Sequence, residues 1–423
     1  MIDSAVQGRA TGDALPRRVF CRDLAALVAS SIVAGILPAH SAEAQTSDSK
    51  QPTRQEALRT MPDPRIPYFA YVGSRTTRER NARGEGLSVF RVDPATGIWT
   101  SVQVLRDLTN PSFLAFDRQR QFLYTVHGDL SEISAFRIDP QSGTLTFINQ
   151  ESTGGRNPVH LCVDPTNRFI IVANHISSSL AVLPIGTDGA LGKICDLVTL
   201  TGKIGPHRVE QPFAKPHQVV FDGTDQFIAV PDKGLDRTFV FRIDTRTGKL
   251  VPVDAATAEA REGAGPRHIA FHPSNAYAYI INELDSTVTA CRFDAATGKL
   301  DPFQVLPALP DTHVGNSRGA EIAVSANGRN VYASNRGHDS IAVFSVDEAT
   351  GRLASIGWQP GGGRTPRFFA LSPAEDVLFV ANEDSDEIVS FRIDQRTTSL
   401  TPAETVARTG SPVCIVFNPA TQA

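Results

Sequence analysis

The chain has 423 residues, of which 41% are hydrophobic and 20% are charged, and its formal net charge is -4. This composition is ordinary for a soluble globular protein, and it gives no basis for a nucleic-acid partner. A chain of this length can bury a large core. Its 32 glycines and 28 prolines are spread along the sequence, which favours an all-β protein with many turns.

The first 44 residues have the pattern of an export signal. Arg17 and Arg18 precede an apolar segment at 24–38, and small residues follow at Ala42 and Ala44. A positive start, an apolar centre and a small-x-small site are the parts of a secretory signal, and the paired arginines look like the twin-arginine type. The apolar segment falls short of the roughly 20 residues that a membrane span requires. We expect export to the periplasm or medium, rather than a membrane anchor or a disordered tail.

Residues 45–66 are polar and contain several prolines, so they read as a linker. Beyond the signal, the chain keeps four cysteines, Cys162, Cys195, Cys291 and Cys414. They show neither CxxC spacing nor histidine pairing typical of zinc, and each lies in an apolar strand context. We therefore expect buried small side chains, and we predict no metal site and no cofactor.

A repeated unit organises residues 67–420. Each copy has a β-rich run that ends in a polar residue, a turn, an apolar strand such as TFVFRID, and a second turn ending in Thr-Gly-x-Leu. Seven marker positions lie 46 to 59 residues apart: Gly97, Gly143, Gly189, Gly248, Gly298, Gly351 and Thr398. A period near 50 with four strands per unit predicts a seven-bladed β-propeller with antiparallel blades.

The two ends of the repeat region are complementary. The first unit begins at its second strand, residues 68–72, and lacks a first strand. The C-terminus supplies an unclaimed first strand, residues 412–417. We therefore predict that the C-terminal strand completes the first blade and closes the ring, which removes an exposed sheet edge.

Propeller geometry brings first-strand starts and second-strand ends together on one face. Asn and Asp at such ends commonly hydrogen-bond turn backbones, although we keep Asp232 and Asn335 as candidate binding residues. Side chains that differ between blades are more informative about a site. The candidates of this kind are His217, Arg267, Glu283, Arg336 and Arg367, with His160, His268 and Glu321 one step deeper.

These groups predict a small-molecule site. Arginines supply paired donors to an anion and to a developing oxyanion, and a carboxylate can position or deprotonate a water. The chemistry fits the opening of an ester or lactone. There is no GxSxG serine elbow, no HExxH and no phosphate-cradling glycine loop, so neither an acyl-enzyme nor a nucleotide cofactor is indicated.

The segments GAGPRHIAFHP, INELDSTV and SNRGHDSIAVF, with KPHQVVFDG before them, resemble the lactonase family of seven-bladed propellers. That family includes bacterial 6-phosphogluconolactonases and the fungal carboxy-cis,cis-muconate lactonizing enzyme. The resemblance implies that His217, Arg267, Glu283 and Arg336 are catalytic. Lys215 stands where many members have the first histidine of a His-x-His pair, and Arg318 stands where a smaller polar residue is common.

The resemblance implies a lactone hydrolase acting on a sugar-acid lactone, nominally 6-phosphogluconolactone. Export argues against a phosphorylated cytoplasmic metabolite, so an unphosphorylated lactone is an open alternative. A muconate-type cycloisomerase and a non-catalytic binding propeller also remain open. A closed ring needs no partner, and we expect a monomer.

Overall fold

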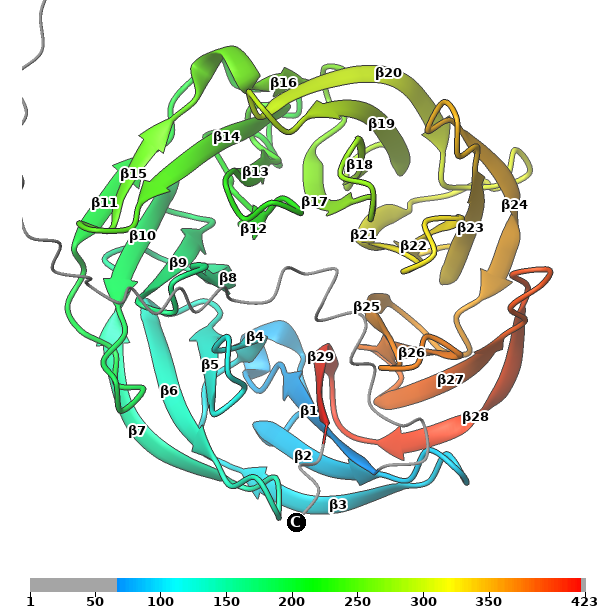
Figure 1. Ribbon diagram of the computed structural model, residues 1–423. Helices are drawn as coiled ribbons and strands as arrows, with labels where there is room; N and C mark the ends of the chain where they lie inside the picture. Colours follow the sequence, from blue (N-terminus) through cyan, green and yellow to red (C-terminus); the bar gives the residue numbers. More distant parts are fainter. Residues whose placement is uncertain (1–66, 420–423) are drawn as a thin grey trace, which may run out of the picture. The chain divides into compact units, whose positions relative to one another are not determined.

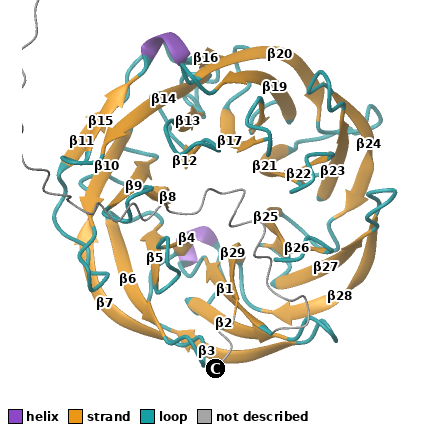
Figure 2. Ribbon diagram, viewed as in Figure 1, coloured by secondary structure: helices purple, strands orange, loops and turns teal. Residues whose placement is uncertain are grey.

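Seven antiparallel sheets, six of four strands and one of five, form a ring in the computed structural model, which describes residues 67–419 (Figure 1). The predicted signal and linker, residues 1–66, lie outside the described residues. Strands make up almost all regular structure there, with two short 3-10 turns, η1 (Arg78–Arg80) and η2 (Asp254–Ala256) (Figure 2). No helix in the described part of the chain is long and apolar enough to cross a membrane.

The predicted ring closure is confirmed. The first blade has the order β29-β1-β2-β3, and the C-terminal strand pairs antiparallel with β1 from Tyr68↔Pro419 to Ser74↔Pro412. Figure 1 shows the red C-terminal arrow beside the blue first strand. The strands of this blade are β29 (Pro412–Pro419), β1 (Tyr68–Ser74), β2 (Leu87–Val92) and β3 (Trp99–Leu105).

The next three blades follow in chain order, each running from the ring centre outward. Blade two contains β4 (Pro111–Phe116), β5 (Phe122–His127), β6 (Glu132–Ile138) and β7 (Leu145–Ser152). Blade three contains β8 (Pro158–Val163), β9 (Phe169–Asn174), β10 (Ser179–Pro184) and β11 (Asp196–Thr199). Blade four contains β12 (Val220–Phe221), β13 (Ile228–Asp232), β14 (Arg237–Asp244), β15 (Lys249–Pro252) and the extra β16 (Ala258–Glu259).

The last three blades are more regular. Blade five contains β17 (Pro266–Phe271), β18 (Tyr277–Asn282), β19 (Thr287–Asp294) and β20 (Lys299–Pro307). Blade six contains β21 (Arg318–Val324), β22 (Asn330–Arg336), β23 (Ser340–Val346) and β24 (Leu353–Pro360). Blade seven contains β25 (Pro366–Leu371), β26 (Val377–Asn382), β27 (Glu387–Ile393) and β28 (Leu400–Arg408).

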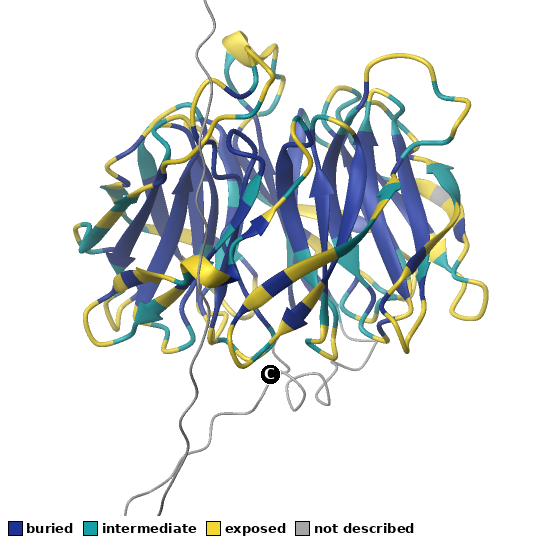
Figure 3. Cartoon of the chain, turned by 90° about the horizontal axis from the view of Figure 1, so that it is seen from above, coloured by how far each residue is buried: buried dark blue, intermediate teal, exposed yellow. Residues whose placement is uncertain are grey.

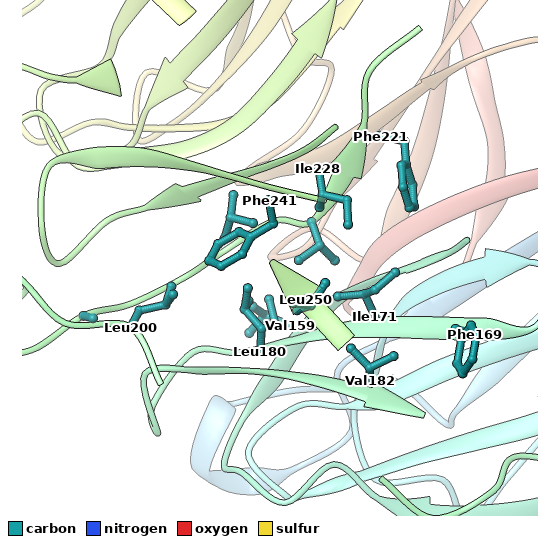
Figure 4. Packing of buried hydrophobic residues seen from close by; sticks show 14 of the residues in the cluster. Val159, Phe169, Ile171, Leu180, Val182, Leu200, Phe221, Ile228, Phe241 and Leu250 are labelled. Carbon is teal, nitrogen blue, oxygen red and sulfur yellow. The ribbon is translucent and has the colours of Figure 1, made fainter. Parts of the chain in front are cut away.

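The core lies between neighbouring blades. Second and third strands are buried on both faces, whereas the outermost strands alternate with exposed residues (Figure 3). Between blades three and four, Ile171 and Leu180 pack with Ile228 and Phe241 in one apolar cluster (Figure 4). The four cysteines are free, and burial raises the pKa of the Cys291 thiol to about 12. Stacked sheets with apolar faces therefore fix the ring geometry.

The repeated Thr-Gly turn has a structural reason. Gly143 has φ +71°, and its carbonyl accepts a hydrogen bond from the Tyr71 hydroxyl of the preceding blade at 2.9 Å. A Cβ there would lie 2.4 Å from the Phe69 ring. The same contact joins Tyr279 to Gly351 at 3.0 Å. At Gly143 only glycine fits both the left-handed backbone and the close approach, so this marker is a contact between two blades.

Candidate active site

A bulge at the start of the inner strands turns one side chain per blade toward the ring axis. In blade five, Pro266 pairs with Asn282 and His268 pairs with Ile281, which leaves Arg267 unpaired. An extra residue of this kind re-aims its side chain. The same shift occurs in blades one, two, three, six and seven. A narrow cavity is lined by most of these residues and by His217, their counterpart in blade four: Ser112, Val159, His217, Arg267, Arg367 and Val413.

A second row of side chains stands at the ends of the second strands. Six of these residues line a wide cavity of about 430 Å³: Arg75, His175, Lys233, Glu283, Arg336 and Glu383. In blade two the corresponding residue is Gly128, where a Cβ would lie 3.3 Å from the Arg75 guanidinium. The wide and narrow cavities share Arg75, Val159, His217 and Arg367, so they adjoin.

Glu283 lies at the centre of the charged groups. Its carboxylate is 3.2 Å from Arg267 Nε, 3.3 Å from Arg336 Nη2 and 3.1 Å from Lys233 Nζ. Arg318 Nη1 follows at 3.6 Å. The Glu283 side chain is only 5% exposed, so the carboxylate is desolvated and almost surrounded by cations.

The backbone holds this cluster in place. The Glu283 N–H donates to the Gly265 carbonyl at 2.7 Å, and the Glu283 carbonyl accepts from Gly319 at 3.2 Å. Arg336 Nη2 donates to the Gly319 carbonyl at 2.9 Å, and Arg267 donates to the Ala320 carbonyl. The start of β21 therefore fixes both guanidiniums against Glu283.

The wide cavity carries surplus positive charge. Seven basic side chains line it against four acidic ones. Arg267, which lines the adjoining narrow cavity, adds a further positive charge. Such an arrangement attracts and binds anions.

Comparison with known proteins agrees with the seven-bladed fold. Residues 69–417 match the family model described as lactonase, 7-bladed beta-propeller. The chain belongs to this lactonase family. It is 34% identical over 353 residues to a 6-phosphogluconolactonase of Bacillus subtilis, covering 83% of this chain and 98% of that protein. A 6-phosphogluconolactonase of Formosa agariphila is 33% identical over 341 residues, covering 78% and 94%.

Solved structures show the same relation. The periplasmic gluconolactonase PpgL of Pseudomonas aeruginosa superimposes with a TM-score of 0.78 at 28% identity, covering 84% of this lactonase and all of that chain. The seven-bladed fold and the lactonase class are therefore common to this protein and its relatives.

The electrostatics of the lactonase cavity fix the charge of Glu283. Burial raises the pKa of its carboxyl group, but Lys233, Arg336 and Arg267 outweigh burial and hold that pKa well below its ordinary value of 4.5. Glu283 is therefore a carboxylate at neutral pH. A carboxylate with so low a pKa is a weak base, so it is better suited to orienting a water than to removing a proton outright.

His217 is buried and neutral. Burial, followed by the nearby charge of Arg267, lowers the pKa of its imidazole well below 6.5. Its Nδ1 atom has no hydrogen-bond partner among the described residues, and the side chain lines both cavities. A neutral imidazole can pass a proton in either direction.

His268 and His160 lie deeper. His268 Nδ1 is 3.0 Å from both oxygens of Glu321, whose pKa burial raises to about 8. His268 also lines the narrow cavity, and its ring lies 5.1 Å from that of His217. His160 stacks on Phe113 at 3.9 Å and lines neither cavity.

Two further predicted binding residues, like His160, lie off the cavity walls. Asp232 Oδ1 accepts backbone hydrogen bonds from Lys215, Gly234 and Leu235, each at 2.9 Å. Asn335 donates to the Ala308 carbonyl at 2.7 Å. Both side chains hold loops, and neither lines the wide or the narrow cavity. Arg367, by contrast, lines both cavities and lies 3.8 Å from Glu383.

Sequence reasoning missed several cavity residues, and Arg75 and Glu210 show why. Arg75 occupies the second-strand end of the first blade, and extending the blade alignment to that strand would have found it. Glu210 comes from the segment between β11 and β12, which accounts for the longest marker spacing, from Gly189 to Gly248. Its carboxylate reaches Arg318 at 2.7 Å and Lys233 at 3.1 Å. The long marker spacing predicts an added loop, but it does not show that the loop reaches the cavity.

Proposed function

We propose that this protein hydrolyses a sugar-acid lactone in the wide cavity around Glu283. The observation that carries the proposal is the contact of one buried carboxylate with Arg267, Arg336 and Lys233 within 3.3 Å. The relatives named 6-phosphogluconolactonase support the reaction class.

The proposed chemistry uses water as the nucleophile. Glu283 accepts a hydrogen bond from a water and aims its oxygen at the lactone carbonyl carbon. Arg267 and Arg336 donate to the carbonyl oxygen as it becomes an oxyanion. The carbon–ring oxygen bond then breaks, His217 passes the proton from the water to the departing oxygen, and the product is a hydroxy acid that releases one proton on ionising.

Proton release therefore provides the assay. Purified protein is given 6-phosphogluconolactone, plain gluconolactone and a muconolactone-type substrate, and the pH indicator is followed above spontaneous hydrolysis. We expect Glu283→Gln and Arg267→Ala to slow turnover by at least about 100-fold. Glu348→Gln, in an exposed ion pair with Arg329, is the matched control. Turnover that survives both site substitutions would place the reaction elsewhere, and turnover of the muconolactone alone would favour a cycloisomerase.

We also propose that the protein acts in the periplasm. The support is the paired Arg17 and Arg18 ahead of an apolar segment, in a pattern typical of twin-arginine export. Cell fractionation tests this by comparing the native chain with a double variant that carries Arg17→Lys and Arg18→Lys. We expect the double variant to stay in the cytoplasm, whereas unchanged export would contradict the signal type.

A further inference from the structure

Lys215 is a cation without a counter-ion. Its side chain lines the wide cavity, yet the residue is only 7% exposed. In the described part of the chain, the other six basic residues lining that cavity each have a carboxylate within 4.0 Å, and Lys215 has none. Its ammonium group instead faces the ring of Phe213, 5.2 Å from the centroid. A buried ammonium without a partner is costly unless it has something to bind.

Lys215 stands beside a second lysine. The Lys233 N–H donates to the Lys215 carbonyl at 3.0 Å, so the two residues are neighbours at the inner end of blade four. Burial and the charge of Lys233 both lower the pKa of Lys215. An anion placed between the two ammonium groups would relieve this repulsion.

Glu210 occupies part of this cationic region. It contacts Lys233 and Arg318, the same two cations that reach Glu283 Oε1. Burial raises the pKa of Glu210, but Lys233 and Arg318 outweigh it and lower that pKa to about 2, so the side chain is anionic. Glu210 belongs to an added loop rather than to a blade. It therefore reaches these two cations from outside the sheet framework.

A plain aldonolactone has no charge, because ring closure consumes its carboxyl group. Such a substrate would leave Lys215 unpaired and Glu210 in place. A lactone with a second acidic group would meet an ammonium ready to bind it. Lysine is a common phosphate binder that acts as a point charge.

We propose that Lys215, with Lys233 and Arg318, forms an anion subsite that binds a second acidic group on the lactone, and that this group displaces Glu210. The inference rests on the proposed lactonase function. The acidic group is a phosphate monoester or a carboxylate, which share the same oxyanion chemistry.

Binding of inorganic phosphate tests the subsite without any turnover. Titration calorimetry on the whole protein compares the native chain with Lys215→Met, Lys215→Arg and the exposed control Lys299→Met. We expect Lys215→Met to bind phosphate about tenfold more weakly, and Lys215→Arg and Lys299→Met to stay near the native value. Glu210→Gln should bind phosphate more tightly, since the internal competitor has lost its charge.

Kinetics then identify the acidic group. The substrates are 6-phosphogluconolactone, an aldaric monolactone with a free carboxylate, and neutral gluconolactone. One of the two charged lactones is expected to use the subsite. For that substrate, Lys215→Met should lower kcat/KM by about tenfold, mainly by raising KM, whereas kcat/KM for neutral gluconolactone should stay near the native value. The thermal midpoint of Lys215→Met, followed by circular dichroism, checks that the variant is folded.

The outcomes separate the two proposals. Equal phosphate affinity in the native protein and a folded Lys215→Met would overturn the subsite, even if lactones are hydrolysed at Glu283. Weaker binding by Glu210→Gln would overturn the displacement of Glu210. Phosphate binding that depends on Lys215, in a protein that opens no lactone, would uphold the subsite and defeat the proposed reaction.

Discussion

Replacing Glu283 with glutamine should destabilise the fold as well as stop the chemistry. Glutamine keeps the size of the side chain but removes its charge. Lys233, Arg267 and Arg336 would then face one another without the carboxylate that each contacts within 3.3 Å. Arg267 is buried and the Arg336 side chain is only 14% exposed, so neither guanidinium is fully solvated.

The magnitude follows from the burial. Breaking a buried ion pair by removing one partner costs about 3–5 kcal/mol, and the Glu283 side chain is 5% exposed. A propeller of about 350 residues has an unfolding entropy of about 0.7 kcal/mol per degree, from about 2.1 cal/mol/K for each residue. The thermal midpoint of Glu283→Gln should therefore lie about 4–7 °C below that of the native protein.

Differential scanning calorimetry at pH 7 and low salt measures this difference. Glu348→Gln removes an exposed carboxylate whose Arg329 partner is 3.1 Å away, and it should shift the unfolding free energy by less than about 1 kcal/mol. A midpoint for Glu283→Gln equal to that of Glu348→Gln would refute the reasoning, because it would mean that the three cations do not depend on the carboxylate.

Further predictions concern the arginines, pH and ring closure. Arg267→Lys should lower kcat by about 100-fold in the proton-release assay, because a lysine cannot both bind the Ala320 carbonyl and reach an oxyanion. With the pKa of Glu283 well below 4.5 and that of His217 well below 6.5, kcat/KM for neutral gluconolactone should show no inflection at pH 6.5; a titration there would contradict a neutral His217. Burial raises the pKa of Glu321 in the folded protein to about 8, so the protonated side chain stabilises the fold below pH 4.5, and this contribution is lost as the pH rises to 8. Glutamine cannot titrate. The unfolding free energy of Glu321→Gln, measured by urea titration, should therefore fall less between pH 5 and 8 than that of the native chain. Deleting residues 412–423 should give an insoluble or protease-sensitive product, as judged by limited proteolysis, and a resistant product would contradict closure by β29.

The fold was predictable because its signals repeat. The spacing of the Thr-Gly markers gave the blade number, and the missing strand before Tyr68 pointed to the C-terminal segment. Local irregularities were less accessible. Blade four has an inner strand of only two residues, Val220–Phe221, where the pattern implied a full strand.

The site was predictable to the extent that it follows the blade register. His217 and Arg267 lie at the starts of inner strands, and Glu283 and Arg336 lie at the ends of second strands. Both positions meet on one face of the ring, so the alignment of repeats brought the four residues together. The alignment could not show side-chain direction. Asp232, in the same row as Asn335, turns to the backbone instead of the cavity.

Loops lie outside any such register. Glu210 reaches the cavity from a segment with no repeated pattern, and its contact with Arg318 joins parts of the chain 108 residues apart. Such a contact depends on the path that the inserted loop takes in the folded protein, and the periodicity of the sequence does not predict that path.

The pairing of β29 with β1 also sets an order of events in biosynthesis. Because β29, which ends at Pro419, is a member of the first blade, the ring cannot close until residue 419 has left the ribosome. A nascent chain that stops short of β29 therefore presents the unpaired inner edge of β1. A premature stop codon before residue 412 would thus remove ring closure.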